Sequence, residues 1–153
     1  MTDKTVLFIC VENSCRSLMA EAMFNSKPPE GWRATSAGTE PASQPNPRTR
    51  AMLQEIGLDL PPHPPQLLTN EMMSASMVRV TMGCLDSESC PARLKTLELR
   101  DWALPDPAKL DDSGFRRVRD ELADRVKGLR LELVLQERRR VELLARPPTT
   151  ASS

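Results

Sequence analysis

The apolar positions in the first forty residues follow two different periods. Residues 4–10 form a short apolar run rich in β-forming side chains, which is typical of a strand buried on both faces. From Arg16 the apolar positions take a helical period, which the prolines at 28 and 29 end. Residues 32–38 then favour a second strand. The pattern therefore predicts a strand, a helix and another strand.

The pattern is less regular through the middle of the chain. It predicts a short helix over 48–56 and a third strand over 76–83. The proline-rich segment 60–65 fits no regular element. Residues 85–107 are expected to be irregular, apart from a short strand near 97–99.

Ser113 is predicted to cap a long C-terminal helix whose apolar positions keep the i, i+3, i+4 spacing. Strands that alternate with helices are typical of a parallel sheet flanked by helices. We therefore expect the α/β class, with one three-layer domain over 1–145 around a four-stranded parallel sheet, and a disordered tail over 146–153. Ligands of such folds bind beyond the carboxyl ends of the strands.

Composition and charge narrow the classes of function. The 153 residues include 21 Lys and Arg against 21 Asp and Glu, and a net charge of zero argues against binding to nucleic acid or to acidic membranes. The longest apolar run, 6–11, is too short for a membrane span. We expect a soluble cytoplasmic protein whose four cysteines are reduced. The single histidine, His63, leaves little for a zinc site and is expected to pack or cap.

Cys10 and Arg16 lie six positions apart across the first junction between strand and helix. Backbone N–H groups converge in such a loop and the helix dipole adds positive potential, so the place favours an anion and a thiolate. Arg16 can bind a tetrahedral oxyanion through two parallel hydrogen bonds, and Ser17 can donate its hydroxyl to the thiolate. The spacing predicts a nucleophile beside an anion clamp. The alternative is a structural cysteine near a surface arginine.

The candidate oxyanion-binding residues are consecutive in the chain. Asn13 tolerates the left-handed backbone that a tightly curled loop needs. Cys15 is expected to pack rather than to react, because it lies just inside the helix start. The full set is Glu12, Asn13, Ser14, Cys15, Arg16 and Ser17.

Cys84 and Cys90 enclose the short polar segment LDSES. Residues six apart on a regular helix are roughly 10 Å apart, whereas a disulfide needs Cα atoms within about 7 Å. If these two cysteines bridge, their segment must loop or unwind. Two unrelated cysteines remain the alternative, and a zinc pair is disfavoured by the spacing and by the missing further ligands.

Asp106 lies between two prolines in DWALPDPA, residues 101–108. The prolines hold the carboxyl group on a rigid loop, where it could act as a general acid. Composition alone favours the alternative, a simple turn aspartate.

Several of these segments resemble one known superfamily. VLFICVENSCRSLMAEAMF at 6–24 resembles the phosphate-binding loop and first helix of low-molecular-weight protein tyrosine phosphatases. ATSAGTEP at 34–41, DWALPDPA and FRRVRDEL at 115–122 resemble its second strand, acid loop and last helix. TMGCLDSESCPARL at 81–94 is similar to the cysteine pair of the superfamily's thioredoxin-coupled arsenate reductases. The phosphatases carry tyrosines after the acid, and this chain has no tyrosine. The resemblance implies a flavodoxin-like, low-molecular-weight phosphatase fold.

The resemblance also implies a cysteine relay that reduces arsenate to arsenite. Cys10 would attack arsenic while Asp106 protonates the leaving oxygen. Cys84 would then attack the Cys10 sulfur, and Cys90 would attack Cys84. Thioredoxin would reduce the resulting disulfide as an external partner, so no tightly bound cofactor is expected. Phosphate or sulfate would bind as analogues, and a monomer is expected. The alternative is a phosphatase that hydrolyses phosphomonoesters through Cys10.

The resemblance further raises a potassium site. The best-described reductases of this kind bind that ion, and Asn13, Glu21 and Ser36 match their pattern. The later ligand positions fall at Pro64 and Gln66, which are poor matches. We therefore expect no metal site.

Overall fold

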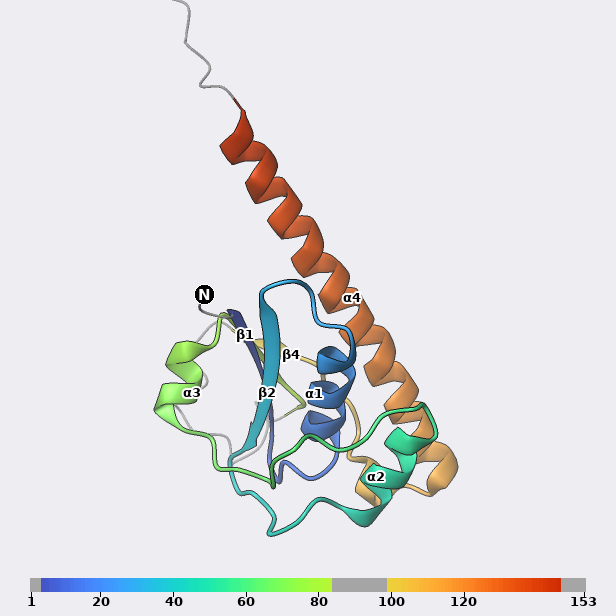
Figure 1. Cartoon of the computed structure of the whole chain (residues 1–153). Helices are drawn as coiled ribbons and strands as arrows, with labels where there is room; N and C mark the ends of the chain where they lie inside the picture. The colour runs from blue at the N-terminus through green and yellow to red at the C-terminus, as the bar shows by residue number, and fades with distance from the viewer. Residues whose placement is uncertain (1–3, 84–98, 147–153) are drawn as a thin grey trace, which may run out of the picture.

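A parallel sheet forms the middle layer of the protein, in a computed structural model that describes residues 4–83 and 99–146. Within these residues the sheet has four strands in the order β2-β1-β3-β4 (Figure 1). All neighbouring strands are parallel. The predicted α/β class and four-stranded parallel sheet are confirmed. The strands are β1 (Lys4–Cys10), β2 (Trp32–Gly38), β3 (Val78–Thr81) and β4 (Arg100–Asp101).

Helices cover both faces of the sheet. One face carries α1 and α4, with α2 beside them, and α3 lies on the other face (Figure 1). Alternation along β1 explains why both layers form: Phe8 joins the cluster under α1 and α4, whereas Leu7 and Ile9 pack with Met73 of α3. The helices are α1 (Arg16–Ser26), α2 (Pro47–Gln54), α3 (Asn70–Ala75) and α4 (Asp112–Ala145), with a short 3₁₀ turn, η3 (Pro107–Lys109).

The structure corrects the prediction for the start of the last helix. Ser113 does not cap it. The side chain of Asp111 does, because its Oδ1 accepts a hydrogen bond from the backbone N–H of Gly114 at 2.8 Å. Ser113 lies within the first turn instead. Gly128 does not interrupt this helix, which runs for 34 residues.

Other element boundaries also differ from the prediction. The helix predicted over 48–56 is the shorter α2, Pro47–Gln54. The strand predicted over 76–83 is β3, Val78–Thr81, which covers only the middle of the predicted range. The third strand starts later than predicted because α3, which was not predicted, occupies the chain before it and ends at Ala75, with Ser76 as its C-cap. The strand expected near 97–99 is found at Arg100–Asp101. Most of the irregular stretch and nearly all of the predicted tail fall outside the described residues, as do Cys84 and Cys90.

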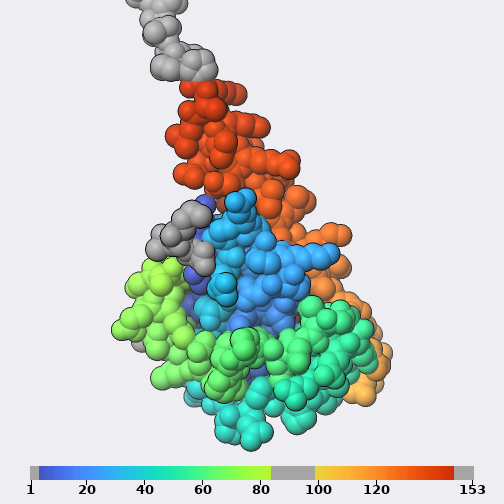
Figure 2. All heavy atoms as spheres, viewed as in Figure 1, coloured from blue at the N-terminus to red at the C-terminus, as the bar shows by residue number. Residues whose placement is uncertain are grey.

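The C-terminal part of α4 extends well beyond the sheet (Figure 1) and projects from the rest of the described chain in the space-filling view (Figure 2). This part exposes several large apolar side chains, and a groove of about 390 Å³ lies between it and Trp32. Despite its length, neither α4 nor any other helix in the described parts of the chain is long and apolar enough to cross a membrane. The exposed side chains are Leu131, Leu135, Val141, Leu143 and Leu144.

Candidate active site

The loop between β1 and α1 curls around the sulfur of Cys10. β1 ends at Cys10 and α1 begins at Arg16, so five residues must turn the chain within this short distance. Asn13 makes the turn with a φ of 51°, which confirms the predicted left-handed residue. The turn brings the backbone N–H of Asn13 to the Cys10 sulfur, to which it donates at 3.2 Å. The loop therefore directs a backbone dipole at the predicted nucleophile.

Neighbouring segments hold the loop in this shape. The carbonyl oxygen of Ser14 accepts from the backbone N–H of Asn46 at 3.1 Å and from the hydroxyl of Thr49 at 2.8 Å. Gly38, at the end of β2, lies against the loop so closely that a Cβ atom there would be 2.5 Å from the carbonyl oxygen of Val11. The close approach requires glycine at this position, where the sequence had indicated only the end of a strand.

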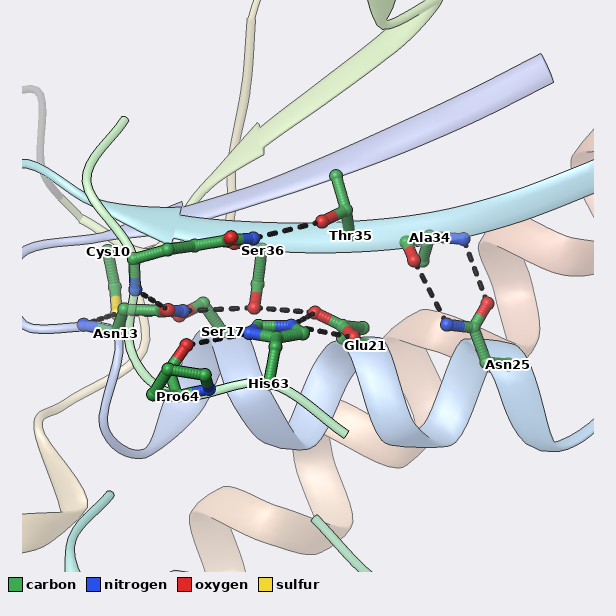
Figure 3. A network of polar contacts seen from close by, with 11 residues as sticks. Cys10, Asn13, Ser17, Glu21, Asn25, Ala34, Thr35, Ser36, His63 and Pro64 are labelled. Carbon is green, nitrogen blue, oxygen red and sulfur yellow. Dashed lines mark hydrogen bonds and ion pairs between the residues drawn. The ribbon is translucent and has the colours of Figure 1, made fainter. Parts of the chain in front are cut away.

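A chain of hydrogen bonds fixes which way the Ser17 hydroxyl points. The backbone N–H of Gln66 donates to Oδ1 of Asn13 at 3.0 Å, which assigns the orientation of that amide. Its Nδ2 then donates to the hydroxyl oxygens of Ser17 at 2.7 Å and Ser36 at 3.0 Å (Figure 3). Because Ser17 accepts there, its own hydrogen is available to the Cys10 sulfur 2.8 Å away. Ser17 can therefore donate its hydroxyl to the predicted nucleophile, as the sequence indicated.

Arg16 is half-buried and lines the same pocket as Cys10. Its Nη1 donates to the carbonyl oxygens of Met82 and Leu104, both at 2.7 Å. These residues follow β3 and β4, so the guanidinium is held across the carboxyl ends of two strands. Both bonds use Nη1, and the fork of Nε and Nη2 is the part of the group that can bind two oxygens of an anion.

A pocket of about 290 Å³ brings the predicted site residues together. Cys10, Arg16 and Asp106 line the same cavity although they come from three separate segments. The carboxylate of Asp106 accepts from the backbone N–H of Ala108 at 3.0 Å and caps η3, which keeps the group at the rim. The lining also contains Lys109, which the sequence patterns did not single out. The complete lining is Cys10, Val11, Glu12, Ser14, Cys15, Arg16, Asp106 and Lys109.

Two predicted oxyanion-binding residues act from behind the pocket instead. The side chains of Asn13 and Ser17 are fully buried and are used in the hydrogen-bond chain to Cys10. Neither residue lines the cavity. They therefore affect anion binding indirectly, because they hold the shape of the loop and the hydrogen bond to the Cys10 sulfur.

The second thiol of the loop, Cys15, has a different environment from that of Cys10. Cys15 occupies the N-cap position of α1 and is 3% exposed. Burial raises the pKa of the Cys15 thiol, and hydrogen bonds with Thr49 and Ser14 offset this only in part. A thiol that stays protonated at neutral pH is a poor nucleophile. The structure agrees with the expectation that Cys15 packs in the core.

Glu21 and His63 form an ion pair behind the loop. The Nε2 atom of His63 lies 2.7 Å from Oε1 of Glu21, and the hydroxyl of Ser36 donates to the same oxygen at 2.7 Å. Nδ1 of His63 must carry a hydrogen, because its partner at 2.7 Å is the carbonyl oxygen of Pro64 (Figure 3). Nε2 lies within 3.0 Å of both oxygens of the Glu21 carboxyl group, an arrangement that favours the imidazolium form of the ring. Burial opposes this, but the bond to Pro64 and the Glu21 carboxylate outweigh it and raise the pKa of His63.

The residues here do not fit a potassium ion. A cation needs free oxygen ligands, yet Oδ1 of Asn13 accepts from the backbone of Gln66. Both oxygens of Glu21 lie within 3.0 Å of the His63 ring, and Ser36 donates to one of them. Elsewhere in residues 4–83 and 99–146, no group of three or more His, Cys, Asp or Glu side chains could hold a metal ion.

Known proteins with similar sequences include arsenate reductases. The chain is 39% identical to arsenate reductase 1 of Staphylococcus epidermidis over 123 residues, which are 80% of this chain and 92% of the relative. It is 37% identical, over the same shares of the two chains, to an arsenate reductase of Staphylococcus aureus.

Solved structures that resemble this chain also include arsenate reductases. A thioredoxin-dependent arsenate reductase of Corynebacterium glutamicum matches 88% of this chain with 30% identity and a TM-score of 0.71, and the match spans 63% of that longer protein. An arsenate reductase in a phosphate-binding state matches 84% of this chain and 98% of its own, with 30% identity and a TM-score of 0.72. An arginine phosphatase of Geobacillus stearothermophilus shares the fold, at 24% identity and a TM-score of 0.75.

The family model described as low molecular weight phosphotyrosine protein phosphatase matches residues 5–140. This match contains the loop of Cys10, the guanidinium of Arg16 and the rim at Asp106. The chain belongs to the low molecular weight phosphotyrosine protein phosphatase family.

Proposed function

We propose that this protein is an arsenate reductase, which converts arsenate to arsenite and is regenerated by thioredoxin. One observation carries the proposal: Cys10, Arg16 and Asp106 line a single small pocket that no aromatic side chain of the described chain helps to line. Such a pocket fits a small tetrahedral oxyanion. The arsenate reductases among the relatives support the same substrate.

The first step uses the groups around the pocket. Arsenate lies in the loop, where backbone N–H groups and the fork of Arg16 bind its oxygens. The Cys10 thiolate attacks arsenic, and one arsenic–oxygen bond breaks. Asp106 gives its proton to the leaving oxygen, which departs as water. The product of this step is an arsenic(V) group bound to the Cys10 sulfur.

The second step moves two electrons from thiols to arsenic. Cys84 attacks the Cys10 sulfur, the sulfur–arsenic electron pair stays on arsenic, and arsenite leaves. Cys90 then attacks Cys84, which frees Cys10 and leaves a Cys84–Cys90 disulfide for thioredoxin to reduce. Both cysteines lie outside the described residues. The described chain before them stops at Gly83. The carbonyl oxygen of the preceding residue, Met82, accepts a hydrogen bond from Arg16, which places Gly83 near the pocket.

The rim of the pocket disfavours the alternative, hydrolysis of aryl phosphates. A phosphotyrosine ring needs apolar or aromatic side chains to stack on. Here the rim carries the charged side chains of Glu12, Asp106 and Lys109. The chain also contains no tyrosine. We expect any phosphatase activity to be residual.

Arsenite formation with thioredoxin, thioredoxin reductase and NADPH tests the proposal. The unchanged protein should turn over many times, and Cys84→Ser and Cys90→Ser should stop after at most one arsenate per molecule. Ser87→Ala and Ser89→Ala lie in the same segment and serve as controls that keep turnover.

Either of two results would overturn the proposal. In the first, Cys84→Ser and Cys90→Ser sustain multiple turnover. In the second, the protein hydrolyses an aryl phosphate rapidly, Cys90→Ser leaves that rate unchanged, and no arsenite forms with the thioredoxin system.

A further inference from the structure

We propose that Lys109 binds the oxyanion substrate at the mouth of the Cys10 pocket, an inference that rests on the proposed function and adds a residue to its site. Lys109 lines the cavity together with Cys10 and Arg16. It comes from η3, which is far in sequence from the loop that holds Cys10. The pocket thus receives cations from two unconnected segments.

The position of Lys109 is fixed relative to the acid. The backbone N–H of Lys109 donates to the carbonyl oxygen of Asp106 at 3.2 Å, and the Asp106 side chain caps the same turn through Ala108. The side chain is exposed at the rim. Among the residues that the structure describes, none forms a hydrogen bond or ion pair with its ammonium group. This cation is therefore available to an anion that enters the pocket.

The other charged groups around the pocket explain why a second cation would help an anion to bind. Glu12 and Asp106 both line the cavity, and a thiolate at Cys10 adds another negative charge. Arg16 alone leaves this group of side chains negative, so a dianion such as arsenate would be repelled as it approached. With Lys109 the two cations balance the two carboxylates, and the thiolate of Cys10 is the one negative charge left over. At a solvated rim, one such charge changes affinity by a factor of a few rather than by orders of magnitude.

Lys109→Gln tests this role because it removes the charge and keeps most of the side-chain length. We expect KM for arsenate to rise roughly three- to fivefold at low ionic strength, with little change in kcat. Lys109→Arg should restore KM, because it restores the charge. Glu12→Gln should change KM in the opposite direction. Lys127→Gln, at an exposed lysine of α4 that does not line the pocket, is the matched control.

Salt separates an electrostatic role from a structural one. The Debye length falls from about 10 Å at 0.1 M to about 3 Å at 1 M salt, so the difference between Lys109→Gln and the unchanged protein should shrink as salt rises. A packing defect would instead persist at all salt concentrations and lower kcat. That result, or a KM for Lys109→Gln equal to that of Lys127→Gln at low salt, would overturn the role of Lys109.

A second measurement keeps this proposal separate from the proposed function. Arsenate, inorganic phosphate and sulfate should each slow the alkylation of Cys10, and Lys109→Gln should need several-fold more anion for the same protection. This assay needs no reduction of arsenate. If protection weakens while no arsenite forms, the proposed reaction fails and the role of Lys109 stands. If arsenite forms and protection is unchanged, the role of Lys109 fails alone.

Discussion

The hydroxyl of Ser17 lies 2.8 Å from the sulfur of Cys10, with its hydrogen directed there by the amide of Asn13. A hydrogen bond donated to a thiolate stabilises the ionised form. The reactivity of Cys10 should therefore depend on a residue that does not touch the substrate.

Ser17→Ala should slow the alkylation of Cys10 by iodoacetamide about tenfold at neutral pH, the size expected for losing one charge-assisted hydrogen bond. Fragmentation of the peptide 5–16 by tandem mass spectrometry separates alkylation of Cys10 from alkylation of Cys15, which lies on the same tryptic peptide. Ser26→Ala is the control, because Ser26 ends the same helix and its hydroxyl donates to the carbonyl oxygen of Met23. Equal rates in the two variants would contradict the assignment.

Arg16→Lys should lower kcat/KM for arsenate by roughly 100- to 1,000-fold, as expected for loss of a donor that binds the reacting anion. Lysine keeps the charge but has no planar fork, and it cannot bind Met82 and Leu104 as Arg16 does. Steady-state kinetics measure the effect. Arg50→Lys, at an exposed arginine beside Asp59, should change kcat/KM by less than a factor of two. If Arg16→Lys changed kcat/KM as little as Arg50→Lys, Arg16 would not bind the reacting anion.

Gly38→Ala and Gly128→Ala should have opposite effects on stability. At Gly38 a Cβ atom would meet the carbonyl oxygen of Val11, so the variant should lose about 1–3 kcal/mol and disturb the Cys10 loop. At Gly128, inside α4, nothing lies within 4 Å of a Cβ atom, and alanine should add about 0.5–1 kcal/mol. Urea unfolding measures both free energies. A neutral Gly38→Ala would show that the loop is not held as closely as described.

The His63–Glu21 ion pair should make stability depend on pH. The pKa of His63 is raised in the folded protein, so the pair's contribution is fully present below the unfolded value of about 6.5 and is lost as pH rises through the folded value. The free energy of unfolding of the unchanged protein should exceed that of His63→Asn by about 1 kcal/mol at pH 6. The difference should shrink by pH 9. A difference that is constant or grows with pH would contradict the imidazolium.

The nucleophile and the anion clamp could be predicted from the sequence because their geometry is local. Cys10 and Arg16 are fixed by one strand, one turn and one helix, and each of these has a clear sequence pattern. The left-handed turn at Asn13 follows from the same short stretch. The family match over 5–140 then agrees with a fold that the alternation of strands and helices had already indicated.

Other features could not be predicted because they depend on contacts distant in sequence or on close competition. Three consecutive side chains, Asp111, Asp112 and Ser113, can each cap a helix, and only the structure shows that Asp111 reaches the amide of Gly114. The six residues of α3 are too few for a helical period to be recognised. Lys109 enters the pocket because η3 folds back to the loop, and no spacing in the sequence records that approach.

Thiol mapping by mass spectrometry after a single arsenate turnover, with no reductant present, tests the central claim most directly. The account predicts one arsenite per protein, a disulfide between Cys84 and Cys90, and free thiols at Cys10 and Cys15. Four free thiols with arsenate unconverted, or arsenite formed with Cys84 and Cys90 both still reduced, would contradict it.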